Sequence, residues 1–594
     1  MNKKDLIPVI LLALLIPAWM IVDRVFLAEK FAAKAPAPVE QTSEPAPTTG
    51  AASALTEAIP QARKQAEAIE VATREVPANE VVETLANDKI RVDLTSIGGG
   101  VKSVTLIAED DGGEILFPEL NEKDSPPVTL NFAKSAALAY QGLAGIEAND
   151  AFNVQKTDDG NSVVFSKAWN SGVVFQRVVT LGDDYMLTVN DRFINNGTNP
   201  WTLPAVRLLT GYMENPPEMK AMKGVSILGV DSHTPTGGVN YWGKKLNKLF
   251  KNADKPESID AVPEEMREVV VDWVSAKNKF FTQIVSPKQP IATMAVLCGR
   301  DVNEKAIMPK DIAAALAFKP TVVDAGAALE LDYDFFIGPK QYSILKAGGN
   351  NMEKVMEFET TGMWSFMNWL MEPSRRALLW TLNMFHSAIP NYGVAIILLT
   401  LLIRILFWPL THKSTESMRR MQEIQPEVKA LQAKYGKNNP QKLQQETMKL
   451  YKEKKVNPMG GCLPMFVQIP VFIALFTVLR NAIELRYSGF LWIADLSQPE
   501  NLFAGAVPVV GSLNILPLLM SASMIWQQKL SSPGAAATPE QQQQQKMMMF
   551  MMPIMMLFFF YSMPSGLVLY WTTSNLLMIA QTGLRNLKKK VKHA

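Results

Sequence analysis

Length, composition and charge predict a protein of several structural units. The chain has 594 residues, 48% of them apolar, and 59 basic against 57 acidic side chains give a formal net charge of +2. At roughly 150 residues per domain, this length predicts more than one domain. The near-neutral charge argues against direct DNA binding. The two cysteines and four histidines are widely separated, so neither a disulfide framework nor a metal site is expected.

The first 60 residues predict a membrane anchor followed by a tether. Leu6–Leu27 is mostly apolar and follows two lysines, and about 20 such residues cross the hydrocarbon layer as a helix. The alternative is a cleaved signal peptide with a small-residue site at 33–35, but the apolar run is long for a signal core. We therefore expect a transmembrane anchor at 1–28 and a flexible Ala- and Pro-rich linker at 29–60.

From residue 61 to 345 the pattern becomes rich in β-strand signals. Runs of branched and aromatic residues, such as Val173–Val179, alternate with turn clusters such as Asn195–Gly197. This pattern predicts a large all-β sandwich. A carbohydrate-processing enzyme is one possibility, but His233 is the sole histidine of the segment and no nucleophile elbow accompanies it. A scaffold or docking domain is therefore favoured.

Residues 346–390 form an amphipathic segment between the β-rich part and the apolar blocks. Trp364, Trp369 and Leu370 precede a basic pair, and further apolar residues follow at helical spacing. Tryptophan-rich amphipathic helices favour the headgroup region of a bilayer. The segment therefore predicts interfacial helices; the alternative is a helix packed on the β domain.

The C-terminal third contains four apolar blocks. Asn391–Leu410, Met459–Leu479 and Ala506–Trp526 each predict one membrane span. Met547–Leu584 has 38 residues without a charge, which as a single helix would be about 57 Å long. It must therefore turn back, and Met563–Gly566 supplies the break. With the anchor, six transmembrane helices are expected, five of them in a core.

The distribution of basic residues orients these spans. Residues 411–458 carry 11 Lys or Arg against 5 Glu, and residues 481–507 carry one Arg against three acids. The tail 585–594 is basic without acids. Positive segments stay in the cytoplasm, so both termini and 411–458 are predicted inside. The β-rich segment is then outside the inner membrane, in the periplasm.

The predicted cytoplasmic loop has two helical stripes. Met418 to Leu431 places apolar residues at steps of three and four, and Asn439 with Pro440 is typical of the start of a second helix. We expect an antiparallel helical hairpin with a basic exterior. That exterior is either a solvated face or a surface that recruits nascent chains.

Arg404 is the one charged residue inside the five C-terminal spans. A guanidinium near the bilayer centre costs about 2.5–3.5 kcal/mol on insertion scales. Lys413, at the predicted cytoplasmic edge, is nine residues away, about 13 Å along a helix, so snorkelling alone is incomplete. Because the other core spans hold no acid, the favoured hypothesis is a cavity wetted from the cytoplasm that accepts a polar or acidic segment of another polypeptide.

Three motifs carry a resemblance. The runs Asn391–Ser414 (NYGVAIILLTLLIRILFWPLTHKS), Val456–Pro470 (VNPMGGCLPMFVQIP) and Pro564–Asn575 (PSGLVLYWTTSN) resemble the YidC family of membrane protein insertases in its Gram-negative form. The resemblance implies a five-helix insertase core at 391–584 in the inner membrane, acting as a non-enzymatic chaperone without a cofactor. It also implies a periplasmic β-sandwich similar to galactose mutarotases.

The same resemblance implies a site and partners. Arg404 would line a hydrophilic groove open to the cytoplasm and to lipid but closed to the periplasm. Expected partners are nascent membrane-protein clients, the Sec translocon, the ribosome and the lipid bilayer. The other residues that match the substrate path are Thr400, Ile469, Phe472, Leu475 and Trp571, the last of which is Tyr in many relatives.

Two other classes of function remain open from the residues. A solute transporter predicts repeated halves, and neither an internal repeat nor a second intramembrane charge is seen. A membrane-anchored periplasmic carbohydrate-active protein predicts activity that survives deletion of 391–594. An insertase needs that region and tolerates the loss of much of 60–330.

Overall fold

The computed structural model falls into two compact units, Lys34–Met356 and Glu357–Ala594 with Met1–Ala33. The predicted anchor and linker lie outside the described residues. These are residues 80–107, 129–214, 228–236, 238–243, 258–290, 292–300, 309–358, 368–435, 439–454, 456, 463–507, 511–531 and 539–593.

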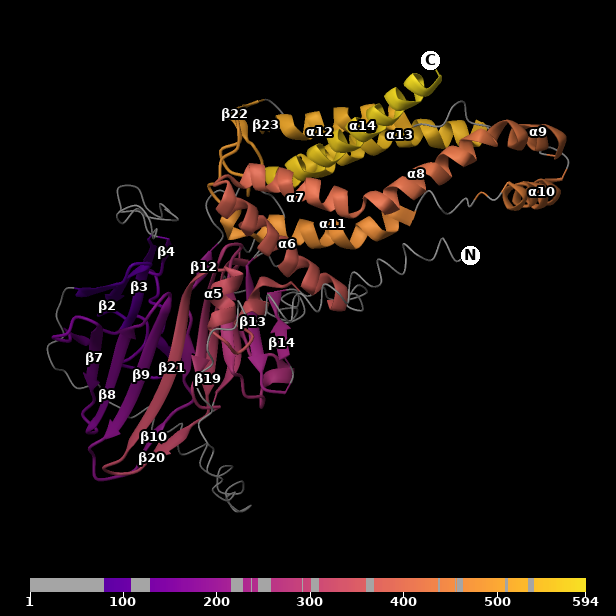
Figure 1. Ribbon diagram of the computed structural model, residues 1–594. Coiled ribbons are helices and arrows are strands. Elements are labelled where there is room, and N and C mark those ends of the chain that lie inside the picture. The colour runs from indigo at the N-terminus through magenta and orange to yellow at the C-terminus, as the bar shows by residue number, and fades with distance from the viewer. Residues whose placement is uncertain are drawn as a thin grey trace, which may run out of the picture. The chain divides into compact units, whose positions relative to one another are not determined.

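The first unit is built around a large antiparallel sheet, which confirms the expected all-β domain (Figure 1). Along Val173–Leu181 and Met186–Asn195, buried positions alternate with more exposed ones, as in strands with one covered face. Gly229–Thr234 and Trp273–Lys277 are buried on both faces. In spatial order the strands are β14 (Gly238–Tyr241), β13 (Gly229–Thr234), β16 (Trp273–Lys277), β17 (Phe281–Pro287), β21 (Ala328–Pro339), β9 (Met186–Asn195), β8 (Val173–Leu181), β7 (Ser162–Ala168) and β6 (Asn153–Lys156).

A second sheet packs against the first through β16 and through the ring contact of Phe318 with Tyr333. Two smaller sheets complete the unit. The second sheet consists of β15 (Ser258–Ala261), β18 (Ala292–Arg300), β19 (Pro309–Phe318), β11 (Arg207–Leu209), β5 (Tyr140–Gln141) and β12 (Met213–Glu214). The smaller sheets are β1 (Val82–Ala86), β2 (Ile90–Thr95), β3 (Gly100–Leu106) and β4 (Leu130–Asn131), and β10 (Trp201–Leu203) with β20 (Thr321–Val323).

A buried ion pair lies in this β unit. Arg177 donates from Nε and Nη2 to the two carboxylate oxygens of Asp191, both at 2.7 Å, and from Nη1 to two backbone carbonyls. Tyr140 donates to the same carboxylate at 2.8 Å and shares a hydrogen bond with Tyr333. Burial, with the charge of Asp191, raises the pKa of Tyr140 well above its usual range. The phenol therefore stays neutral and acts as a donor.

The described part of the second unit consists mostly of helices. The short helices α5 (Tyr342–Ala347) and η5 (Met352–Met356) end the β unit, and the long helices follow. These are α6 (Asn368–Ala388), α7 (Tyr392–Leu406), α8 (Trp408–Glu423), α9 (Gln425–Tyr435), α10 (Pro440–Glu453), α11 (Leu463–Asn481), α12 (Ile515–Ser531), α13 (Pro539–Phe560) and α14 (Ser565–His593).

Helix α14 contacts α7, α11 and α12, while α6 packs on α7 and α11. The predicted break at Met563–Gly566 is confirmed, since α13 ends at Phe560 and α14 begins at Ser565. The interfacial position of 346–390 stays a prediction.

Two predicted spans are wrong in their bounds. Asn391–Leu410 is not one straight helix, because α7 ends at Leu406 and meets α8 at a bend of 58°. Pro409 lacks the N–H that would continue the hydrogen-bond ladder, and its ring clashes with the preceding turn. Ala506–Trp526 begins as a hairpin of β22 (Leu502–Val507) and β23 (Gly511–Leu513), and its helix starts only at Ile515.

Within the described part of the chain, a single helix of membrane-spanning length and hydropathy is not found. The bent pair Tyr392–Leu406 and Trp408–Ser414 meets that test only together, and Ile469–Asn481 and Met549–Phe560 are shorter apolar stretches. The count of six spans remains a prediction.

The helical hairpin predicted at 411–458 is formed largely as expected, where it is described. The side chain of Asn439 accepts the N–H of Lys442 at 3.0 Å and caps α10, with Pro440 in the first turn. Lys454 pairs with Glu427 at 2.6 Å, which joins the end of α10 to the start of α9. The stripe from Met418 to Leu431 is divided between α8 and α9 rather than continuous, because Pro426 starts a new helix.

Gly393 makes a close approach that only glycine allows. A Cβ there would lie 2.1 Å from the ring of Phe490. We expect Gly393→Ala to destabilise the helical unit by about 1–3 kcal/mol, the usual effect of overpacking. Gly583→Ala is the matched control, because nothing lies within 4 Å of its Cβ position. Thermal unfolding of both variants in detergent measures the difference, and equal midpoints would contradict the prediction.

Candidate functional site

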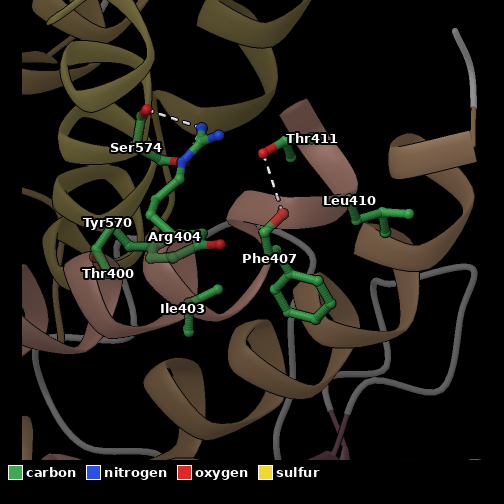
Figure 2. A pocket seen from close by; sticks show the side chains of 8 residues that line it. All are labelled: Thr400, Ile403, Arg404, Phe407, Leu410, Thr411, Tyr570 and Ser574. Carbon is green, nitrogen blue, oxygen red and sulfur yellow. Dashed lines mark hydrogen bonds between the residues drawn. The ribbon is translucent and has the colours of Figure 1, made fainter. Parts of the chain in front are cut away.

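Arg404 lies in the last turn of α7, directly before the bend. Its Nη2 donates to the backbone oxygen of Ser574 at 2.8 Å and to the hydroxyl of the same residue at 2.7 Å (Figure 2). The sequence did not indicate these two protein acceptors, and access of water to the guanidinium stays a prediction. A neutral residue on α14, 170 positions away, supplies two acceptors and leaves the positive charge in place.

A small cavity surrounds this contact. Its volume is about 20 Å³, room for about one water molecule. The hydrophilic groove implied by the family resemblance stays a prediction. The eight side chains around the cavity carry one cation and no carboxylate; they are Thr400, Ile403, Arg404, Phe407, Leu410, Thr411, Tyr570 and Ser574 (Figure 2).

Helical spacing assembles the polar part of the cavity. Thr400 precedes Arg404 by one turn on α7, and Tyr570 precedes Ser574 by one turn on α14, so both pairs present one helix face. The Thr400 hydroxyl donates to the carbonyl of Ile396 at 2.6 Å, which satisfies it within its own helix. α7 packs on α14, and the two pairs therefore line the same cavity.

Two of the predicted apolar residues, Phe472 and Trp571, belong to an aromatic cluster. Phe472 and Trp571 make an edge-to-face contact with ring centroids 4.9 Å apart, and Phe560 lies 5.4 Å from Trp571. Leu475 is fully buried and Ile469 is half-buried. None of these is among the residues around the Arg404 cavity. Of the predicted site residues, Thr400 and Arg404 line this cavity, and a client path along the others stays a prediction.

The prediction missed Tyr570 and Ser574. Both belong to the motif PSGLVLYWTTSN, and each lies beside a residue that drew attention for other reasons. Their spacing of four on one helix was the available signal. The sequence did not show that this face of α14 packs against α7.

Residues 486–507 and 511–514 form hydrogen bonds with the opposite ends of the helices. The N–H groups of Ser565 and Gly566, the first residues of α14, donate to the carbonyls of Gln498 and Leu496, both at 2.8 Å. The Tyr561 hydroxyl after α13 donates to the Ser512 carbonyl at 2.8 Å. Protein therefore covers this end of the bundle.

Comparison with known proteins decides the family. Residues 384–592 match the model of the 60Kd inner membrane protein, and residues 84–373 match that of the YidC periplasmic domain. The membrane protein insertase YidC of Syntrophus aciditrophicus is 31% identical over 82% of this chain and 81% of its own length. The chain belongs to the YidC family of membrane protein insertases. That of Treponema denticola is 29% identical over 99% of this chain and all of its own length.

Solved structures match long stretches of this chain, but their TM-scores are low. An active YidC insertase with its first transmembrane domain resolved is 19% identical, covers 86% of this chain and 94% of its own, and has a TM-score of 0.33. A putative aldose 1-epimerase from Escherichia coli is 10% identical over 44% of this chain, with a TM-score of 0.26.

Membership of the YidC family makes this an inner-membrane insertase with a periplasmic domain rather than a member of an enzyme family.

Proposed function

We propose that this chain inserts integral inner-membrane proteins, and helps them to fold and assemble, through a cytoplasm-open site centred on Arg404. The observation that carries the proposal is the cavity between α7 and α14. It holds a guanidinium that is hydrogen-bonded by a neutral serine and surrounded by residues without a carboxylate. An uncompensated cation in such surroundings attracts an acidic or polar client segment.

The energy for insertion comes from the client itself. Burial of apolar surface releases about 0.025 kcal/mol per Å² removed from water. A client helix of about 20 apolar residues therefore gains more than a short polar tail loses while Arg404 and water hold it. Neither ATP nor a cofactor is needed for a small client.

The aromatic cluster is the proposed apolar side of the path. Phe472 and Trp571 are half-buried and offer adaptable rings to a client helix. Leu475 is enclosed in the bundle, so its contact with a client requires α11 to move. We propose that α7, α11 and α14 separate to admit a polypeptide segment beside Arg404.

The proposed topology has six transmembrane helices, with both termini and the hairpin 411–458 in the cytoplasm. The charge asymmetry of the loops supports it. Residues 486–507 and 511–514 close the periplasmic end, consistent with their hydrogen bonds to the helix ends. Clients and the bilayer are the partners implied by the family; the Sec translocon and the ribosome, contacted by the basic hairpin and tail, are further proposed partners.

Deletion of each part of the chain tests the proposal. We expect loss of 61–345 to leave insertion of a small client largely intact, because the cation and the aromatic cluster lie elsewhere. Loss of 391–594 should abolish it. The measurement is protease protection of a radiolabelled client in proteoliposomes. Insertion that survives loss of 391–594 would overturn the proposed role of the helical core.

Ser574 gives a finer test. Ser574→Ala removes the hydroxyl acceptor and leaves the carbonyl, so about 1 kcal/mol of hydrogen bonding to Arg404 is lost. We expect roughly a fivefold lower insertion rate for an acidic-tailed client. Ser574→Thr keeps the hydroxyl and should retain most of the rate. Equal rates for the alanine and threonine variants would contradict a positioning role for this hydroxyl.

A further inference from the structure

A tight turn at Phe490–Ile493 places two large apolar side chains at its tip. The N–H of Phe490 donates to the carbonyl of Ile493 at 2.8 Å, and the N–H of Ile493 donates back at 2.9 Å. Leu491 and Trp492 are the two central residues. Leu491 has φ of +54° and is 76% exposed, and Trp492 is 43% exposed.

This arrangement is unfavourable in water on two counts. The first central position of such a turn favours Gly or Asn, because a branched side chain is strained at positive φ. A leucine there also leaves its apolar surface uncovered. Phe503 repeats the combination, with φ of +54° and 70% exposure. An apolar environment around both side chains would offset the strain.

The tip is held rigidly rather than free. Phe490 packs on Gly393 in the first turn of α7. The indole of Trp492 donates to Glu500 at 2.9 Å, and the same carboxylate accepts the N–H groups of Ile515 and Leu516 at the start of α12. Leu491 and Trp492 therefore keep a fixed position beside the ends of two helices.

The composition of the tip is typical of the membrane–water interface. Residues 487–494 contain no charged side chain, and both Tyr487 and Trp492 are exposed aromatic residues with a polar atom. Such residues favour the boundary between headgroups and acyl chains. The outward side chains of α7, including Leu401 and Ile405, continue the apolar surface towards the other end of that helix.

We propose that residues 487–494 together with Phe503 form a lipid anchor that inserts into the outer leaflet of the inner membrane. The proposal rests on the proposed topology, which places this end of α7 and α12 at the periplasmic face. The anchor fixes the depth of the closed end of the bundle, while the site at Arg404 lies near the other end of α7.

Depth-dependent quenching tests the anchor in the full chain. The two cysteines are replaced (Cys298→Ala, Cys462→Ala), and an environment-sensitive fluorophore is attached through Leu491→Cys or, independently, Phe503→Cys. The protein is reconstituted in phosphatidylethanolamine–phosphatidylglycerol vesicles with lipids spin-labelled at shallow or deep positions. Asp158→Cys, an exposed polar turn of the β unit, is the matched control.

We expect shallow spin labels to quench positions 491 and 503 at least threefold more than position 158. Quenching equal to that at 158 would overturn the anchor. A blue-shifted fluorophore without lipid quenching would also overturn it, since the tip would then be covered by protein. Client insertion by the same vesicles is scored in parallel. Its failure would count against the proposed function, whereas quenching reports on the tip alone.

Discussion

Replacing Arg404 with alanine is expected to reduce insertion of an acidic-tailed client at least tenfold. The guanidinium is the one cation around the α7–α14 cavity. Its loss removes the charge that attracts the tail and the donor that contacts Ser574. A charge-assisted interaction of about 1.5–3 kcal/mol corresponds to this factor or more. Protease protection in proteoliposomes gives the rate, with expression and thermal stability measured for the same preparation.

Three comparisons separate attraction of the client from loss of structure. Arg404→Lys keeps the charge and should retain part of the activity. Arg480→Ala removes a partly buried arginine that lies over Phe476 on α11, outside the cavity, and should have little effect on the client. A client with a neutral tail should be much less sensitive to Arg404→Ala. Unchanged insertion of the acidic client would refute the role assigned to this residue.

Breaking the buried ion pair of the β unit is expected to have the largest effect on stability. Arg177→Met leaves the carboxylate of Asp191 buried without its cation, and Asp191→Leu leaves the guanidinium unpaired. Both side chains are at most 1% exposed, and removal of one partner from such a pair typically destabilises by about 3–5 kcal/mol. Proteolysis of the full chain across a urea series measures the decrease in the free energy of unfolding of the β unit.

The double variant and a surface pair serve as controls. Arg177→Met combined with Asp191→Leu leaves no buried charge and should lose less than the sum of the single changes. Arg192 and Glu330 form a pair on the same sheet, at 2.9 Å, that is 40% and 51% exposed. Arg192→Met should therefore change stability by less than about 1 kcal/mol. If Arg177→Met and Arg192→Met lowered the free energy of unfolding equally, burial of the ion pair would not explain the loss of stability.

Much of the architecture is predictable from local patterns. Alternating apolar residues in 61–345 indicated strands, and long uncharged blocks after 390 indicated helices. The break at Met563–Gly566 and the cap at Asn439 were identified because proline, glycine and asparagine act on their own turn of backbone. Arg404 was identified as a candidate site residue for an equally local reason, because a single charge within an apolar run can be recognised from the neighbouring residues alone.

The errors arose where a local pattern competed with longer-range structure. Ala506–Trp526 is apolar throughout, yet its first part pairs as the β22–β23 hairpin and Glu500 caps the helix that starts at Ile515. Apolar content alone does not distinguish a strand from a helix. Packing of α14 on α7 also places Tyr570 and Ser574 around the Arg404 cavity, which no pattern along the chain indicated.

The sequence by itself determined most of the strand-rich and helical regions, where the charges are concentrated and that Arg404 is the lone charge within its apolar run. Only the tertiary structure decided that Ser574 binds Arg404, that Asp191 holds Arg177, and that Leu491 projects from a strained turn. The physical reason is that periodicity, capping and charge count depend on neighbours along the chain. The partner of a buried polar group depends instead on which faces meet in space.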